Sequence, residues 1–312
     1  MTLTNAGSLP APVDAGRLQP GPGAARDQVI RLRDGRRLGY REHGPAAGTP
    51  LLFFHGLGTS RVICPIDDGL ADRLNVRTIA VDRPGIGLSD RHRGRRLLDF
   101  PGDVAELADQ LSLEHFAVVG WSGGGPYAAA CAYRLPDRVR VAGLISAPAP
   151  ISGVGRADYL RRFHRTAALS ARRAPWTIRL ALWHWGRPQR RDAERFFERS
   201  FADMCRADQQ VLSERSVRQQ MIDNSAELYR QGGRGMYDEA LILARPWGFE
   251  PGDIRVPVWI WHGEQDETVP AAMAQHMASR IPSSTVTMYA DEGHHLLYRR
   301  WPEILAALTQ MS

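Results

Sequence analysis

The sequence FAVVGWSGGGP at residues 116–126 joins a short apolar run, a glycine-rich turn and the start of a helix. Its centre, Gly120 to Gly124, matches the pattern G-x-S-x-G with Ser122 in the middle. A strand, a sharp turn and a helix in this order lift the serine oxygen above a sheet edge, beside a helix N-terminus that favours negative charge. The glycines are needed because the serine backbone is strained and neighbouring chains leave no room for side chains. We predict that Ser122 is a nucleophile.

Other short apolar runs flank this stretch and alternate with segments of helical length. Runs that are apolar at nearly every position are typical of strands buried on both faces, as in a parallel sheet. The predicted strands are Leu51–Phe54, Thr78–Val81, Phe116–Val119, Val141–Ile145, Val258–Trp261 and Thr285–Tyr289, and the predicted helices include Pro101–Leu111, Pro126–Leu135 and Ala271–Ile281. Ahead of them, Asp34-Gly35 between two strand-like runs, Val29–Arg33 and Arg36–Tyr40, predicts a β-hairpin. The alternation predicts a doubly wound α/β fold.

The alternation stops over residues 150–245, which show no convincing strand pattern. We expect amphipathic helices there, including Tyr159–Ala171, Ala193–Met204 and Val217–Gln231, with apolar faces such as the one formed by Leu160, Phe163, Ala167 and Leu169. A helical block inserted after the sixth strand predicts a cap over the carboxyl edge of the sheet, where ligands bind in open α/β sheets. The expected organisation is a disordered leader over 1–26, a core over 27–149 and 246–312, and a helical cap over 150–245.

A serine nucleophile needs a base, and the base needs an acid that orients it. After the strand that ends at Trp261, Asp266 could reach across the sheet edge, and Glu264 and Glu267 are its competitors. The other common position for the acid, residues 146–150, holds no carboxylate. Further on, the sequence DEGHH at 291–295 offers two histidines. We prefer His294 as the base because Gly293 lets the chain turn tightly before it. His295 then becomes a residue that packs nearby or supports the residues of the site.

Acyl transfer also needs two backbone donors for the developing oxyanion. The N–H of Gly123, the residue after the nucleophile, is the first expected donor, and the loop after an early strand supplies the second. That loop reads His55-Gly56-Leu57-Gly58, and the N–H of Leu57 is our choice. We expect His55 to fix the loop by hydrogen bonds rather than to act as a catalyst.

Five segments together resemble the α/β-hydrolase superfamily, in its capped, esterase-like and epoxide-hydrolase-like branch. They are HGLG at 55–58, DRPGIGLSD at 82–90, GWSGGGP at 120–126, HGEQDETVP at 262–270 and EGHHLL at 292–297. The resemblance implies a mostly parallel eight-stranded sheet and a Ser122–Asp266–His294 triad. It departs at Gly58, where many relatives carry proline, so we expect a more mobile oxyanion loop.

The serine at position 122 narrows the reaction, because similar dehalogenases and epoxide hydrolases use aspartate there. It favours an acyl-enzyme, and thus hydrolysis of an ester or lactone of a small, largely apolar molecule. A thioester, an amide or a carbon–carbon bond is the alternative substrate. A lyase or cyclase on the same triad and a non-catalytic binding protein also stay open. Four tryptophans of the inserted region, Trp176, Trp183, Trp185 and Trp247, suggest either an apolar pocket or plain core.

Composition excludes several other classes. The net charge is +6, carried by arginine alone because the chain has no lysine, and the basic runs at 91–96 and 187–195 are short or interrupted by acids. We expect no nucleic-acid partner and no membrane span, since no run of about 18 apolar residues occurs. Three scattered cysteines indicate reduced thiols in a cytoplasmic protein. No metal cluster or phosphate loop is visible, so we expect no cofactor, and the oligomeric state stays open.

Overall fold

The central feature of the fold is an eight-stranded sheet in the order β1-β2-β4-β3-β5-β6-β7-β8. The computed structural model describes residues 26–65, 67–151 and 162–310. The strands are β1 (Arg26–Arg31), β2 (Arg37–His43), β3 (Thr49–Phe54), β4 (Val76–Val81), β5 (Phe116–Trp121), β6 (Val139–Ile145), β7 (Val258–Gly263) and β8 (Ser284–Tyr289). Only the pairings of β2 with β1 and β4 are antiparallel, so the predicted mostly parallel sheet is confirmed.

The predicted hairpin is also confirmed. Strands β1 and β2 pair from Arg26 with Glu42 to Arg31 with Arg37. Gly35 has φ +88° in the turn between them, a conformation that glycine adopts without steric cost. The disordered leader was expected over residues 1–26; residues 1–25 lie outside the described residues, and Arg26 is the first residue of β1.

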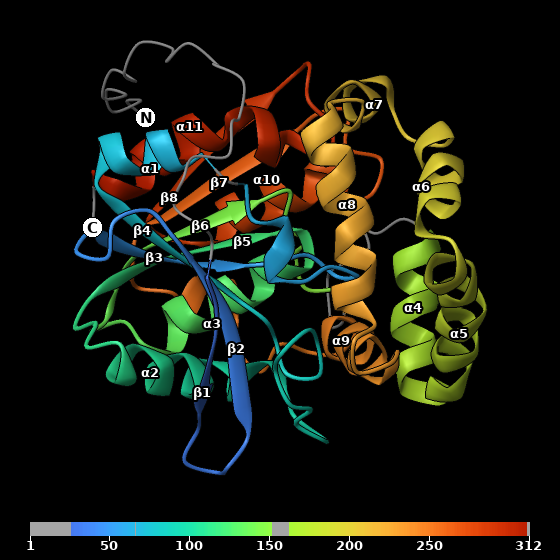
Figure 1. The fold of residues 1–312 in the computed structure, drawn as a ribbon, viewed down its shortest axis with the longest axis horizontal. Coiled ribbons are helices and arrows are strands. Elements are labelled where there is room, and N and C mark those ends of the chain that lie inside the picture. Colours follow the sequence, from blue (N-terminus) through green and yellow to red (C-terminus); the bar gives the residue numbers. More distant parts are fainter. Residues whose placement is uncertain (1–25, 66, 152–161, 311–312) are drawn as a thin grey trace.

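Helices cover both faces of the sheet and enclose two separate hydrophobic cores. Helices α2 (Phe100–Gln110), α3 (Gly125–Arg134) and α10 (Ala271–Arg280) pack on one face, and α1 (Asp68–Leu74) and α11 (Leu296–Thr309) on the other (Figure 1). Strand β5 contributes to both cores in strict alternation, with Phe116 and Val118 in the first and Ala117 and Val119 in the second. This two-sided burial explains why the central strands read as continuous apolar runs.

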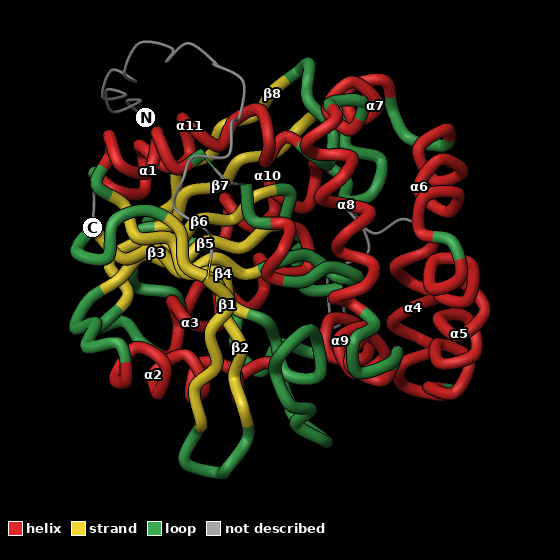
Figure 2. The backbone as a smooth tube through the Cα atoms, viewed as in Figure 1, coloured by secondary structure: helices red, strands yellow, loops and turns green. Residues whose placement is uncertain are grey.

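A block of helices follows β6 and precedes β7, so the predicted helical insertion is confirmed. Its helices are α4 (Arg162–Arg173), α5 (Pro175–Arg191), α6 (Ala193–Ala202), α7 (Arg206–Leu212), α8 (Arg215–Leu228) and α9 (Arg234–Ala244). Figure 2 shows these helices gathered along one end of the sheet, and no strand occurs over the described range 162–245. Helices α8 and α9 form the inner layer, against which α4, α5 and α6 pack.

The apolar face expected on the first inserted helix is wrong in part. Leu169 is 50% exposed, whereas Ala171 of the same helix is 3% exposed and packs with Leu241 and Ala244 of α9. Helix α4 thus docks through a small residue that lets the two helices approach closely, and Leu169 lies on the outer side. Ala167 is half-buried, Leu160 lies outside the described residues, and nothing is described of the Phe163 side chain.

The tryptophans of the inserted region divide between core and surface. Trp247 is 3% exposed and packs beside Phe249, with ring centroids 5.7 Å apart, so it belongs to the hydrophobic core. Trp176 and Trp183 are 65% and 51% exposed. The side chain of Trp185 is not described.

Buried ion pairs fix the inner helices of the insertion to the core. Glu239 of α9 is 1% exposed and lies 2.5 Å from Arg83 Nε, in contact with Arg95, and 2.8 Å from the Tyr127 hydroxyl that donates to it. Burial alone would raise the pKa of the Glu239 carboxyl, but Arg83 and Arg95 lower it to about 2. The carboxylate is therefore charged at neutral pH, and both guanidinium groups depend on it.

A second buried cluster repeats this arrangement beside helix α8. The Arg61 guanidinium is fully buried and lies 2.7 Å from Asp82 of the core and 2.7 Å from Glu227 of α8. Asn224 of α8 accepts hydrogen bonds from the Ser60 amide and hydroxyl at 2.8 and 2.9 Å. The inner layer is thus held to the loop after β3 by several buried polar contacts.

We expect Glu239→Gln to destabilise the protein by about 3–5 kcal/mol, because two buried guanidinium groups lose their counter-charge. The matched control is Glu198→Gln, which removes an exposed partner of Arg218 at 2.8 Å and should cost about 0–1 kcal/mol. Equilibrium denaturation in urea measures both. An equal loss in the two variants would contradict a structural role for the buried cluster.

Candidate active site

Ser122 stands at the sharp turn between β5 and α3. Its φ is +51°, in the left-handed region that non-glycine residues rarely adopt, so the predicted strained serine is present. The flanking glycines are needed for close approach. A Cβ atom on Gly120 would lie 2.2 Å from the Gly124 carbonyl oxygen, and one on Gly124 would lie 2.0 Å from that of Phe54. Any side chain at either position would force the turn open.

The structure brings Ser122, His294 and Asp266 together in a hydrogen-bonded chain. His294 Nε2 lies 2.9 Å from Ser122 Oγ, and His294 Nδ1 lies 2.8 Å from Asp266 Oδ2. The other oxygen of Asp266 accepts the amides of Thr268 and Val269 at 2.8 and 2.7 Å. A carboxylate held in this way keeps the proton on Nδ1, so Nε2 is free to accept the serine proton.

The electrostatics of His294 suit a general base. Burial disfavours the imidazolium and lowers the pKa of His294, but the charge of Asp266 and its hydrogen bond outweigh this effect and raise the pKa above its ordinary value. A nearby carboxylate stabilises the protonated ring that forms when the base accepts a proton.

The competing candidates, Glu264, Glu267 and His295, take no part in the hydrogen bonds that join Asp266, His294 and Ser122. Glu264 and Glu267 are exposed, and residues 146–150 include no carboxylate. His262 is fully buried and its Nε2 lies 2.9 Å from the Val269 carbonyl oxygen, so it supports the loop that carries Asp266. His295 points to Asp208 instead of Ser122, with Nδ1 3.2 Å from Oδ1.

Asp208 of helix α7 is a site residue that sequence reasoning missed. It is 4% exposed and accepts the backbone amides of His294 and His295 at 3.0 and 2.7 Å. Burial raises the pKa of Asp208, but its bonds to His295 hold the pKa well below the usual range. A carboxylate from the insertion therefore fixes the loop that carries the proposed base, across a separation of 86 residues that no local pattern reveals.

The same contact corrects the reason given for Gly293. This residue does not have positive φ, so it is not needed for a tight turn. A Cβ atom on Gly293 would lie 2.6 Å from the Asp208 carboxylate. Glycine at 293 therefore lets the carboxylate approach the two histidine amides.

Trp121 also supports the histidine loop. Its indole N–H donates to the His294 carbonyl oxygen at 3.0 Å, and its ring lies beside the His294 ring with centroids 5.3 Å apart. Trp121, the variable residue before the serine in the G-x-S-x-G pattern, thus helps to support the site, a role that the pattern alone does not reveal.

The two expected oxyanion donors lie close to each other. The Leu57 amide nitrogen is 2.7 Å from the position that a Cβ on Gly123 would take. Within the described parts of the chain, the Leu57 amide donates to no acceptor. Two side chains hold this loop in place. Arg83 donates to the carbonyl oxygens of His55 and Gly56, and the Thr59 hydroxyl donates to the Gly56 carbonyl oxygen at 2.9 Å. These bonds restrain a loop that the glycine at position 58 was expected to loosen.

His55 lies beneath this loop and is fully buried. Its Nε2 accepts the Arg83 amide at 3.3 Å, and its Nδ1 lies 3.0 Å from the Gly56 carbonyl oxygen. Burial and the Arg83 charge hold the pKa of His55 well below its ordinary value. A neutral, hydrogen-bonded ring agrees with the expectation that His55 fixes the loop.

The described residues form neither a cluster suited to a metal ion nor a helix that could span a membrane. No group of three or more histidine, cysteine, aspartate or glutamate side chains among them is arranged to hold a metal ion. None of their helices combines the length and the apolar composition needed to cross a bilayer.

Comparison with known proteins identifies the family. A family model described as the alpha/beta hydrolase fold matches residues 49–300. This chain belongs to the α/β hydrolase family. The match begins with β3 and ends within α11, so it includes the segments that hold Ser122, Asp266 and His294. The predicted family and fold are therefore confirmed.

Curated relatives of this α/β hydrolase carry different names. It is 30% identical over 263 residues to a dihydrolipoyllysine-residue acetyltransferase component of an acetoin cleaving system from Cupriavidus necator. The match covers 84% of this chain but only 62% of that relative. It is 29% identical over 292 residues to a non-heme chloroperoxidase from Streptomyces lividans, covering 89% of the chain and 96% of the relative. Family membership thus does not fix the reaction.

A solved esterase from Exiguobacterium antarcticum has the same fold. The two structures align with a TM-score of 0.67 over 91% of this chain and all of the esterase, at 19% sequence identity. A likeness at this identity concerns the fold alone.

We expect Asp208→Ala to lower kcat by about 10²-fold, because a histidine displaced by about 1 Å loses its alignment with the serine. The acid limb of the pH profile should also move to lower pH, since the charge of Asp208 contributes to the raised pKa of His294. Asp203→Ala, at an exposed aspartate of the same region, is the control and should change neither quantity. Loss of stability with an unmoved pH profile would limit Asp208 to a structural role.

We expect Asp266→Asn to reduce kcat/KM by about 10⁴-fold while leaving the fold intact. Removing the carboxylate removes the charge that stabilises the imidazolium, so the pKa of His294 falls. Activity needs neutral His294 and rises with pH through that pKa, so the residual activity should rise at lower pH than in the wild type. A pH–rate profile of both proteins measures this. An unimpaired variant would reassign the acid to Glu264 or Glu267.

Proposed function

We propose that this chain is a serine hydrolase that cleaves a carboxylic ester or lactone through an acyl-enzyme. The observation that carries the proposal is the chain of hydrogen bonds from Asp266 through His294 to Ser122, at 2.8 and 2.9 Å. The strained backbone of Ser122 adds support, because strain of this kind persists where function requires it. We expect the substrate to be a small molecule.

In the proposed mechanism, His294 Nε2 removes the proton from Ser122 Oγ as that oxygen attacks the substrate carbonyl. The carbonyl oxygen becomes negatively charged and accepts hydrogen bonds from the amides of Leu57 and Gly123. The imidazolium, stabilised by Asp266, then gives its proton to the leaving alkoxide, which leaves an acyl group on Ser122. A water molecule, deprotonated by His294, then attacks the acyl group, and the imidazolium returns the proton to Ser122 Oγ as the bond to the acyl group breaks and the acid is released.

The helical insertion is proposed to act as a lid that sets the substrate range. Leu243 of α9 lies 3.1 Å from the position that a Cβ on Gly123 would take, so the insertion reaches the nucleophile turn. Covering this edge of the sheet excludes water and forms a binding cavity. The proposal assigns the chemistry to core residues and the choice of substrate to residues of α5, α8 and α9.

We expect Ser122→Ala to abolish hydrolysis of p-nitrophenyl esters, with a loss on the order of 10⁶-fold in turnover, while the far-ultraviolet circular dichroism stays unchanged. A fluorophosphonate should label the wild type and not the variant. His295→Ala is the control, because this neighbouring histidine points away from Ser122, and it should retain most activity. Activity of Ser122→Ala within tenfold of the wild type would overturn the proposal. Fluorophosphonate labelling of Ser122 without turnover of any ester would instead favour the hypothesis of a lyase or cyclase.

A further inference from the structure

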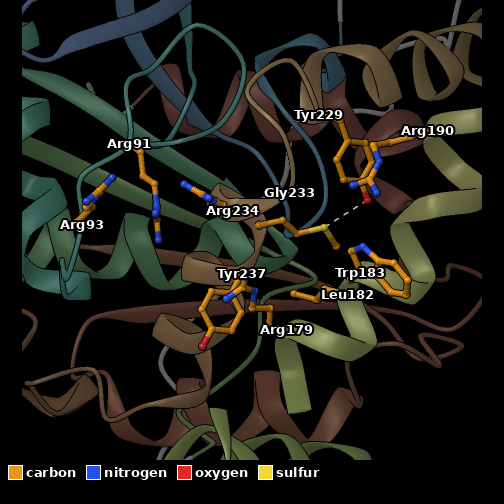
Figure 3. Close-up of a pocket in the computed structure, with 11 residues that line it drawn as sticks. Arg91, Arg93, Arg179, Leu182, Trp183, Arg190, Tyr229, Gly233, Arg234 and Tyr237 are labelled. Atoms are coloured by element: carbon orange, nitrogen blue, oxygen red, sulfur yellow. Dashed lines mark hydrogen bonds between the residues drawn. The ribbon is translucent and has the colours of Figure 1, made fainter. Parts of the chain in front are cut away.

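A cavity of about 450 Å³ lies between the insertion and the loop that follows β4 (Figure 3). It is lined from three separate segments: the loop at residues 91–93, helix α5, and the region from the end of α8 into α9. Its volume falls in the range of cavities that hold small organic ligands. Nothing in the proposed mechanism uses it.

The lining of this cavity carries a single sign of charge. Five of its residues are arginines, Arg91, Arg93, Arg179, Arg190 and Arg234, and none is an aspartate or glutamate. Figure 3 shows that these arginines surround the cavity instead of following one another along a helix. Charges that converge on a hollow from distant segments focus a positive potential there, whereas a solvated charge run spreads over a convex surface.

Little within the described residues compensates these charges. Arg91 pairs with Asp238, with Nε 2.5 Å from the carboxylate, and Arg190 lies over the Tyr229 ring at 5.1 Å from its centroid. For Arg93, Arg179 and Arg234, no acidic partner occurs within 4 Å among the residues that the structure describes. Guanidinium groups in this state are well suited to carboxylates and phosphates, which they bind through paired hydrogen bonds.

The cavity also has apolar lining residues, and one of them, Met236, lies beside the oxyanion loop. Met236 is 4% exposed, lines the cavity, and packs in a cluster with Ile86 and Leu228. Its Cε lies 3.5 Å from the position that a Cβ on Gly58 would take, next to the proposed donor Leu57. The cavity thus combines arginine side chains with an apolar residue, Met236, that lies between it and the proposed catalytic loop.

We propose that this cavity binds the anionic end of the substrate. The substrate class is an ester that carries a carboxylate or phosphate group, separated from the scissile carbonyl by an apolar segment that passes over Met236. The position of the scissile carbonyl rests on the proposed hydrolase function. The binding of the anion does not, because it depends only on the arginines.

Binding to the Ser122→Ala protein tests the anion site without turnover. Octanoate, octyl phosphate and neutral 1-octanol are titrated by isothermal calorimetry at low ionic strength and in 0.5 M NaCl. We expect one of the anions to bind at least tenfold more tightly than octanol. Its binding should weaken in high salt because four of the five arginines are exposed. The tighter of the two anions identifies the anionic group. Equal affinity for octanol and both anions would overturn the proposal.

The variants locate the site. In the Ser122→Ala background, Arg179→Gln with Arg234→Gln should weaken anion binding at least tenfold. Arg199→Gln, at an exposed arginine of α6 outside the cavity, is the matched control and should leave it unchanged. Equal weakening in the control, or none in the double variant, would contradict binding in this cavity.

Turnover separates this proposal from the proposed function. In the protein with an intact Ser122, kcat/KM for the p-nitrophenyl monoester of octanedioic acid is compared with that for p-nitrophenyl octanoate. We expect a preference of at least tenfold for the anionic ester, which falls toward unity in the double arginine variant. If the anions bind but neither ester is hydrolysed, the proposed hydrolase function is wrong and the proposed anion binding in the cavity stands. If both esters are hydrolysed but anion binding does not depend on the arginines, the proposed hydrolase function stands and the proposed anion site is wrong.

Discussion

The hydrogen bond between Asp266 and His294 is the interaction on which the site depends. It joins the loops after β7 and β8, while Ser122 follows β5, so the three residues meet only because parallel strands end at one edge of the sheet. A histidine without this partner would lose both its orientation and its raised pKa. The buried strands therefore serve the chemistry by placing three loops at one edge, an arrangement that open α/β sheets offer generally.

The helical insertion contributes carboxylates to the core, of which those of Asp208 and Glu239 are buried and that of Glu227 is partly buried. Asp208 holds the amides of the histidine loop, Glu239 holds Arg83 beneath the oxyanion loop, and Glu227 pairs with Arg61. Each of these groups would be costly to bury without its partner. The position of the insertion is thereby coupled to the geometry of the proposed site, so substitutions in the insertion can affect catalysis as well as substrate choice.

The sequence predicted the features that depend on local patterns and missed those that depend on distant contacts. Apolar runs revealed the strands, and the short motifs around Ser122, Asp266 and His294 revealed residues that the structure brings together. Asp208 was missed because its partners lie 86 and 87 residues away, and the space that Gly293 provides is visible only in three dimensions. The buried face of α4 was misassigned because Ala171, a small residue, makes the contact and Leu169 does not.

The central claim is that Ser122 attacks a carbonyl whose oxygen is stabilised by the amides of Leu57 and Gly123. A crystal structure of the protein after reaction with a small alkyl phosphonate tests this most directly, because the adduct imitates the tetrahedral intermediate. The account predicts phosphorus bonded to Ser122 Oγ and its free oxygen about 2.7–3.1 Å from both amide nitrogens. An adduct on another residue, or one whose oxygen points away from Leu57 and Gly123, would contradict it.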